Sequence, residues 1–180
     1  MKQKVITDDV KMGLYFGSIA GLVAGLLLGV LVAFAINKCN AWGDGDAPLY
    51  TEADAKMLAK MLYGECRGVK SDTEKAACAW VVLNRVDASG WSNTISGVVT
   101  ARSQFVGYRT KNPVWPELLE LAEDVLGRWE REKAGESNVG RVIPAGYYFF
   151  TADGRLGNRF RKDFKSKSYW DWSLPSPYTE

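Results

Sequence analysis

The chain of 180 residues contains no histidine, which excludes both a metal site built on imidazole and a catalytic triad that uses histidine. Its three cysteines, Cys39, Cys66 and Cys78, are scattered and too few for a zinc site made of cysteine. We therefore expect neither a metal nor a cofactor.

Net charge is low as well, at +2, but it is unevenly distributed. Seven lysines and arginines lie between Arg141 and Trp170, against only two aspartates. A basic face there would suit an anionic polymer such as wall teichoic acid or the carboxylates of peptidoglycan. It would also suit nucleic acid, or be a solvated surface without a partner.

Charge is absent altogether from residues 12–36. As a helix this run would extend about 37 Å, which exceeds the roughly 30 Å hydrocarbon core of a bilayer. Its length and the lack of a clear cleavage site favour an uncleaved anchor over a removed signal peptide, although cleavage stays open. Three lysines precede the run and only Lys38 closely follows it, so residues 1–11 should be a cytoplasmic flank. The sequence thus predicts a single-pass membrane protein whose remaining chain lies on the cell wall side.

Glycine recurs at every fourth position of this segment, from Gly13 to Gly29, and so occupies one helix face. Such a stripe lets two helices approach closely and predicts self-association in the membrane. It could instead weaken the hydrophobicity of the segment and ease its release, as in phage endolysins with releasable anchors, or be coincidence. Residues 37–50 have the composition of a linker, which leaves 51–180 as one compact domain.

Within this domain, a helical apolar pattern stops abruptly near Glu65. Thr51 and Asp54 form a capping box that should begin this helix, and Glu65 falls about where it ends. A carboxylate at the C-terminal end of a helix, beside apolar side chains, is favoured in its protonated form. Glu65 is therefore a candidate general acid, although the spacing alone also fits a solvated glutamate at a helix end.

Further helices are predicted over residues 72–85, 94–101 and 116–132. Residues 142–150 predict a strand, and a turn at 152–154 should lead into a second strand over 155–160. The expected fold class is α+β, mostly α, with a small C-terminal β-hairpin and one preceding transmembrane helix.

The run from Tyr63 to Gly68, followed by Ala79 to Val86, resembles the SleB-like cell wall hydrolases, a family that includes spore cortex-lytic enzymes. The resemblance covers about residues 51–178. Cys66 and Val69 depart from the family pattern, in which alanine and an acidic residue are usual. Neither departure removes the glutamate that the family uses as its catalytic acid. Further matching stretches are Asn93 to Ile95, Ser103 to Phe105, and Pro144 to Phe160 with the tail that ends at Tyr178.

The resemblance implies a lysozyme-like domain that cleaves peptidoglycan between N-acetylmuramic acid and N-acetylglucosamine, with Glu65 as the catalytic acid. It also implies that Gln104, Phe105 and Tyr148 bind the glycan, because amides and aromatic rings suit sugars. Relatives act as lytic transglycosylases, which need one carboxylate, whereas a muramidase would need a second one roughly 5 to 10 Å away. A non-catalytic, membrane-tethered wall-binding protein is the alternative from another class. The expected partners are peptidoglycan and the membrane, and not nucleic acid.

The cysteines allow a further hypothesis, because Cys66 adjoins the proposed acid. A disulfide between Cys39 and Cys66 could hold the enzyme inactive at the membrane until exchange with Cys78 released it. The simpler interpretation is that Cys66 and Cys78 are small packed side chains and that Cys39 is incidental.

Overall fold

The computed structural model describes residues 48–153 and 157–178. The chain divides into two compact units, Met1–Ala47 and Pro48–Glu180, and the first of these lies outside the described residues. The predicted membrane anchor over 12–36, its glycine stripe and Cys39 therefore lie outside them too. None of the helices in the two described ranges has the length and apolar character needed to cross a bilayer.

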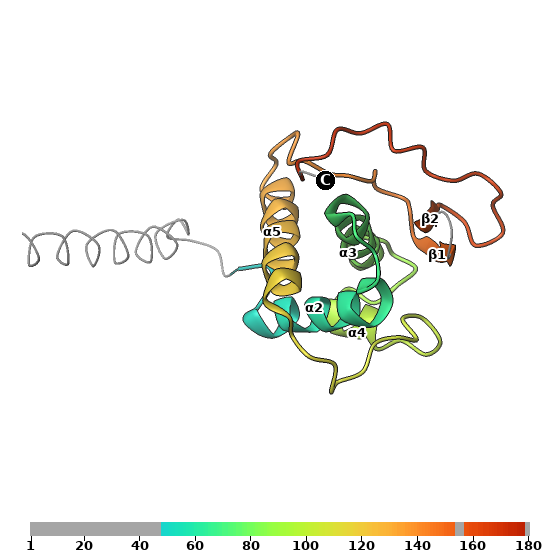
Figure 1. Cartoon of the computed structure of the whole chain (residues 1–180). Helices are drawn as coiled ribbons and strands as arrows, with labels where there is room; N and C mark the ends of the chain where they lie inside the picture. The colour runs from blue at the N-terminus through green and yellow to red at the C-terminus, as the bar shows by residue number, and fades with distance from the viewer. Residues whose placement is uncertain (1–47, 154–156, 179–180) are drawn as a thin grey trace, which may run out of the picture. The chain divides into compact units, whose positions relative to one another are not determined.

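The described part of the second unit is mostly helical, with one small antiparallel hairpin, as the sequence predicts (Figure 1). Its helices and strands are α2 (Glu52–Cys66), α3 (Asp72–Asp87), α4 (Ile95–Val99), α5 (Pro116–Lys133), β1 (Phe149–Asp153) and β2 (Gly157–Arg161).

The helices begin where capping residues place them. The Thr51 hydroxyl accepts a hydrogen bond from the Asp54 N–H, and the Asp54 carboxylate accepts one from the Thr51 N–H, so the predicted capping box is confirmed. Ser71 caps α3 by accepting from the Glu74 N–H, and Pro116 occupies the first turn of α5. These caps satisfy backbone donors that the first turn of a helix cannot pair internally.

Helix α3 is the centre of the domain. Every residue from Ala76 to Arg85 is buried, and α2, α4 and α5 all pack against this helix (Figure 1). A helix that is apolar on all sides can be stable only in such a position, because it has no face to give to water. The large side chain of Trp80 lies at its middle and is fully buried.

The hairpin starts later than the sequence predicts, because β1 begins at Phe149 and not at residue 142. The predicted strand over 142–148 is therefore wrong. Carbonyl groups of this segment accept hydrogen bonds from the side chains of Asn84 and Arg85 on α3, so they are not free to pair with a strand. Tyr148 therefore lies just before β1 and not within a strand.

Beyond β2, residues 162–178 form an extended tail that returns toward α3 and α5 (Figure 1, red). Polar contacts at several points hold it, and one of them is the bond from the Trp170 backbone N–H to the Phe160 carbonyl at 2.9 Å. The Trp170 indole N–H donates to the carbonyl of Val142 at 3.0 Å, and the hydroxyls of Thr73 and Ser176 share a hydrogen bond. Near its end, the Tyr178 hydroxyl donates to Asp124 of α5 at 2.7 Å. The tail thus links the hairpin back to the helices.

Candidate functional site

Glu65 lies in the last turn of α2, as predicted, and its side chain is half-buried. The backbone N–H of Gly107 donates to Oε1 of Glu65 at 2.6 Å. No other described residue forms a hydrogen bond with this carboxyl group, so Oε2 has no hydrogen-bond partner in the described part of the chain. The last turn of α2 carries no basic residue that would neutralise the carboxylate.

Two glycines bring the loop of Gly107 against the end of α2. A Cβ atom on Gly64 would clash with the backbone of Gly107, and a Cβ on Gly107 would clash with the backbone of Gly64. The two backbones touch where neither residue has a side chain, and this contact permits the bond from Gly107 to Glu65. Sequence inspection quotes Gly64 within a motif and overlooks Gly107, because only the fold shows that the two are neighbours.

Side chains from both partners fasten this contact. The amide of Asn112 donates to the carbonyl oxygens of Gly107 and Lys60, at 3.0 and 3.1 Å. The Lys60 ammonium donates in turn to the Thr110 carbonyl at 2.6 Å. The loop is thereby tied to α2 on both sides of Gly107, and the Gly107 N–H is held toward Glu65. Nothing in the sequence singles out Asn112 for this position.

A buried arginine connects this loop to residues 144–148, the segment that leads into the hairpin. Arg85 is 4% exposed, and its guanidinium lies over the rings of Trp91 and Phe105 at 4.3 and 4.9 Å. Its Nε donates to the carbonyl of Tyr148 at 2.7 Å, and its Nη1 donates to Oε1 of Gln104 at 2.9 Å. Burial lowers the pKa of Arg85 to about 10. Arg85 thus fixes two of the predicted glycan-binding residues relative to each other.

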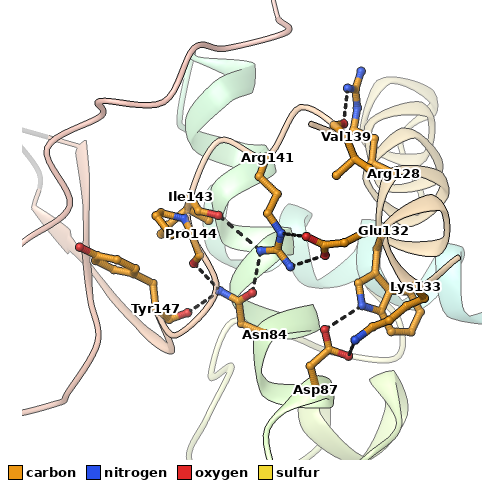
Figure 2. Close-up of polar contacts among 11 residues, drawn as sticks. Asn84, Asp87, Arg128, Glu132, Lys133, Val139, Arg141, Ile143, Pro144 and Tyr147 are labelled. Atoms are coloured by element: carbon orange, nitrogen blue, oxygen red, sulfur yellow. Dashed lines mark hydrogen bonds and ion pairs between the residues drawn. The ribbon is translucent and has the colours of Figure 1, made fainter. Parts of the chain in front are cut away.

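The preceding residue, Asn84, also holds the segment that leads into the hairpin (Figure 2). Its amide nitrogen donates to the carbonyls of Pro144 and Tyr147 at 3.1 and 3.0 Å. Its amide oxygen accepts from Arg141, which also forms a two-bond ion pair with Glu132 of α5 at 2.7 Å. Asn84 and Arg85 therefore position residues 144–148 together. Sequence inspection sees this pair only as part of a family motif and misses its structural role.

The predicted glycan-binding residues occupy different environments. Gln104 is half-buried, and because Oε1 is engaged by Arg85, its amide N–H groups remain for a ligand. Phe105 is only 6% exposed and packs against Phe150, so in this arrangement it supports the loop from beneath. Tyr148 is half-buried, with its ring 6.4 Å from that of Trp91. A hollow of about 580 Å³ is lined by residues of the loop 99–110, Gln104 and Tyr108 among them, but not by Glu65.

The two described cysteines are packed side chains. Cys66 and Cys78 are both fully buried and form no disulfide, and the Asn158 amide lies 3.9 and 3.4 Å from their sulfur atoms. Burial raises the pKa of the Cys78 thiol well above its ordinary value. A disulfide from Cys39 to Cys66 would therefore require this end of α2 to open. The pairing itself involves a residue outside the described part.

Glu74 in the first turn of α3 also contacts the hairpin. Its carboxylate accepts a hydrogen bond from the backbone N–H of Asn158 at the start of β2. It also lines a second cavity of about 360 Å³ between α3 and the tail, together with Trp172 and Ser176. Glu74 thus links α3 to the hairpin, and its carboxylate is directed toward β2.

Comparison with known proteins adds independent information. A model of the Cell Wall Hydrolase family matches residues 70–167, more than half of the chain, and Glu65 lies just before this span. The spore cortex-lytic enzyme of Bacillus cereus is 40% identical over 50 residues, which are 28% of this chain and 19% of that protein. The spore cortex-lytic enzyme of Oceanobacillus iheyensis is 28% identical over 85 residues, 45% of this chain and 30% of that protein.

The matched segments thus span less than a third of the length of these curated relatives. No solved structure matches the chain, so the likeness to the lysozyme fold stays a prediction. The family assignment rests on the family model and agrees with the motifs around Asn84 and Arg85. On this basis, the chain belongs to the cell wall hydrolase family.

Proposed function

We propose that the domain cleaves the glycan strands of peptidoglycan between N-acetylmuramic acid and N-acetylglucosamine, with Glu65 as the one acid–base group. The observation that carries this proposal is the geometry of Glu65: one oxygen is fixed by the Gly107 N–H at 2.6 Å, and the other has no partner among the described residues. A carboxyl group held in this way is oriented for proton transfer without losing its proton-carrying oxygen. Membership of the cell wall hydrolase family supports the same substrate.

The proposed reaction is that of a lytic transglycosylase. Oε2 of Glu65 gives its proton to the glycosidic oxygen, the bond from that oxygen to C1 of the muramic acid breaks, and N-acetylglucosamine leaves with a free 4-hydroxyl group. The Glu65 carboxylate then takes the proton of the muramyl C6 hydroxyl, whose oxygen bonds to C1 and closes a 1,6-anhydro ring. No water is consumed, and Glu65 ends in its starting protonation state.

The surroundings of the nearby carboxylates favour this route over hydrolysis. A hydrolase of the muramidase type needs a second carboxylate near the acid. The two carboxylates that follow Glu65 most closely in the sequence are engaged elsewhere: Asp72 pairs with Lys75 at 2.7 Å, and Glu74 accepts from the Asn158 N–H. A one-carboxylate mechanism does not need either of them.

Gln104 and Tyr148 are proposed to contact the sugars, with Phe105 supporting them from below. The free amide N–H groups of Gln104 can donate to an N-acetyl carbonyl or to a hydroxyl. The half-buried ring of Tyr148 offers an apolar face and a hydroxyl group. Because Arg85 bonds to Gln104 and to the Tyr148 carbonyl, one side chain sets the spacing between these two contacts.

Product analysis tests the reaction directly. The full-length chain, in a mild detergent, is incubated with purified peptidoglycan, and the released fragments are weighed by mass spectrometry. We expect fragments that end in 1,6-anhydro-muramic acid, one water lighter than the hydrated form. Hydrated reducing ends would show a muramidase instead, and an unchanged glycan would refute cleavage and leave a binding protein.

We also infer that residues 12–36 anchor the protein in the membrane with its N-terminus in the cytoplasm and the domain on the cell wall side. The support comes from the sequence, in which a long uncharged run follows three lysines. The glycine stripe of this run is proposed to pair two such helices. A reporter that is active only outside the cytoplasm, fused after Pro48, should be active, and replacing Lys2 and Lys4 by glutamate should weaken its signal. Activity of a cytoplasm-specific reporter at this position would overturn both the orientation and the substrate.

A further inference from the structure

One face of the hairpin carries cations and aromatic rings together. In β2 the residues alternate, so that Asn158 and Phe160 are buried while Arg159 and Arg161 lie half-buried on the opposite face. The Nη1 of Arg161 donates to the Phe164 carbonyl at 3.0 Å, and its Nε is buried. Phe149 lies opposite Arg161 in the register and shares its face. We call this set the hairpin face; with the residues of the tail that cover it, its members are Phe149, Arg159, Arg161, Lys162, Phe164 and Tyr169.

The rings hold the cations of this face in place. The Arg159 guanidinium lies 4.4 Å from the centre of the Tyr169 ring, and Arg161 lies 5.5 Å from that of Phe164. Lys162 lies 5.3 Å from the ring of Tyr147. Phe164 remains 65% exposed, which is unusual for a large apolar side chain that has no ligand.

No acidic side chain neutralises this charge. Throughout residues 48–153 and 157–178, every ion pair uses a cation of a helix or Arg141, and none uses Arg159, Arg161 or Lys162. Asp163 is the one acidic residue between positions 157 and 170, and its carboxylate accepts from the Lys165 N–H. The charge of the hairpin face is therefore available to a partner that brings anions.

The face continues toward the candidate site through a series of ring contacts. The centres of Phe164 and Phe149 are 5.8 Å apart, and those of Phe149 and Trp91 are also 5.8 Å apart. Trp91 lies in turn beside Tyr148 and under the Arg85 guanidinium. On the buried side of the hairpin, Asn158 contacts Cys66, the residue after Glu65. A polymer bound near Glu65 and Tyr148 can thus extend over the hairpin face.

We propose that the hairpin face binds the free carboxylates of the stem peptides that branch from the glycan. This inference rests on the proposed function, because it takes the bound polymer to be peptidoglycan. Alternating rings and cations match a polymer that presents sugar surfaces and carboxylates by turns. A purely phosphate-bearing polymer or a lipid surface would have no use for ring contacts that run on to Tyr148. The enzyme would then prefer glycan that still carries its peptides.

Binding to two forms of the same glycan tests this preference. The full-length Glu65→Gln chain, in detergent and unable to consume the glycan, is mixed with insoluble peptidoglycan that is either intact or stripped of its stems by an amidase. The test variant adds Arg159→Gln and Lys162→Gln. The matched control adds Arg131→Gln and Lys56→Gln, which remove the same charges from exposed positions on α5 and α2. Thermal unfolding checks that all of these variants are folded.

We expect the parent chain to bind intact peptidoglycan more tightly than the stripped form. The test pair should weaken binding to the intact form about fivefold and barely change binding to the stripped form, since exposed pairs are individually weak. The control pair should change neither. Equal binding of both forms, or equal effects of the test and control pairs, would each overturn the inference.

Its failure can be told apart from failure of the proposed reaction. Normal release of anhydro fragments by the wild-type chain, without any dependence on stem peptides, would refute the hairpin face alone. Tight, stem-dependent binding without any released fragment would refute cleavage and keep the role of the face.

Discussion

Most cations of the helices and the cations of the hairpin face have different partners. On the helices, cations meet carboxylates: Lys75 pairs with Asp72, Arg128 with Asp124, and Lys133 with Asp87. On the hairpin face, Arg159 and Arg161 meet aromatic rings instead. Arg85 of α3 is an exception among the helix cations, because it too lies over aromatic rings. The ion-paired cations of the helices stabilise the scaffold, whereas the charge of the hairpin face is proposed to serve a ligand.

The proposed acid and the proposed binding groups also differ in the contacts that position them. The proposed acid lies at the end of α2, and its position depends on backbone contacts with the loop around Gly107. The proposed binding groups lie on the loop at Gln104, before β1 at Tyr148 and on the hairpin face, and Arg85 of α3 holds the first two in place. Asn84 and Arg85 thus connect the region of the proposed acid to the segment that carries the proposed binding groups. Variants on either side of this connection should separate reaction from binding.

The largest effect is expected at the acid. Glu65→Gln keeps the shape of the side chain and its acceptor for Gly107 but has no proton to give. Turnover of peptidoglycan should fall by at least the roughly 10² to 10⁴-fold typical of a general acid, while binding through the hairpin persists. Fragment release and sedimentation with insoluble glycan measure the two separately. Glu120→Gln, at an exposed position on α5, is the control. Near-normal turnover of Glu65→Gln would show that Glu65 is not the general acid.

A smaller effect is expected where α2 meets the loop. In Gly64→Ala the new Cβ meets the backbone of Gly107, so the loop must move away and its N–H must leave Glu65. We expect a loss of about 2 kcal/mol in the free energy of unfolding and up to about 10²-fold in turnover. Gly68→Ala is the matched control, because a Cβ there meets nothing within 4 Å. If both variants behave alike in urea unfolding and in fragment release, the close contact does not position the acid.

The position of the acid could be predicted from the sequence, since caps and apolar periodicity act over a few residues. Thr51, Asp54 and the apolar positions between Ala55 and Leu62 locate α2 and place Glu65 at its end. The start of the hairpin could not be predicted in the same way. The aromatic run from Tyr147 to Phe150 has the composition of a strand, but Asn84 and Arg85, some sixty residues earlier, take the carbonyls that its first part would need.

Residues whose role depends on contacts with distant parts of the chain cannot be identified from local sequence patterns either. Gly107 and Asn112 contact α2 only because the loop returns to it, and neither residue type is unusual in a loop. Phe105 illustrates the converse: its neighbours in the sequence indicate a binding loop, yet its own side chain is buried against Phe150. A local pattern can locate a loop but cannot say which of its side chains faces outward.

Loss of the Asn84 hydrogen bonds should lower the stability of the domain. Asn84→Ala leaves the carbonyls of Pro144 and Tyr147 and one donor of Arg141 without their partner in a buried setting. We expect the free energy of unfolding to drop by about 2 kcal/mol, measured by urea unfolding. Asn93→Ala, at an exposed asparagine, should stay within about 0.5 kcal/mol of wild type. A change in the Asn84 variant as small as that of its control would mean that the segment before β1 holds itself in place.

The smallest effect concerns the end of the tail, where the hairpin region is tied back to the helices. The Tyr178 hydroxyl donates to Asp124 at 2.7 Å, and burial, with help from this bond, raises the pKa of Tyr178 above its ordinary value. Tyr178→Phe should lower the free energy of unfolding by about 1 kcal/mol at neutral pH. Tyr169→Phe is the matched control, since no described residue hydrogen-bonds its hydroxyl, and it should be near neutral.

The pH dependence of the Tyr178 variant gives a second check. A raised pKa means that the folded state favours the neutral hydroxyl, so its contribution is complete below about pH 10, where the unfolded chain also keeps the proton. As the pH rises further, the unfolded chain ionises first, and the contribution is lost on the way to the folded pKa. The difference between wild type and Tyr178→Phe should therefore be constant up to about pH 10 and shrink above that pH in urea unfolding. A difference that stays constant above about pH 10 would show that the Asp124 bond does not anchor the tail, and that the contacts of Trp170 and Ser176 hold it instead.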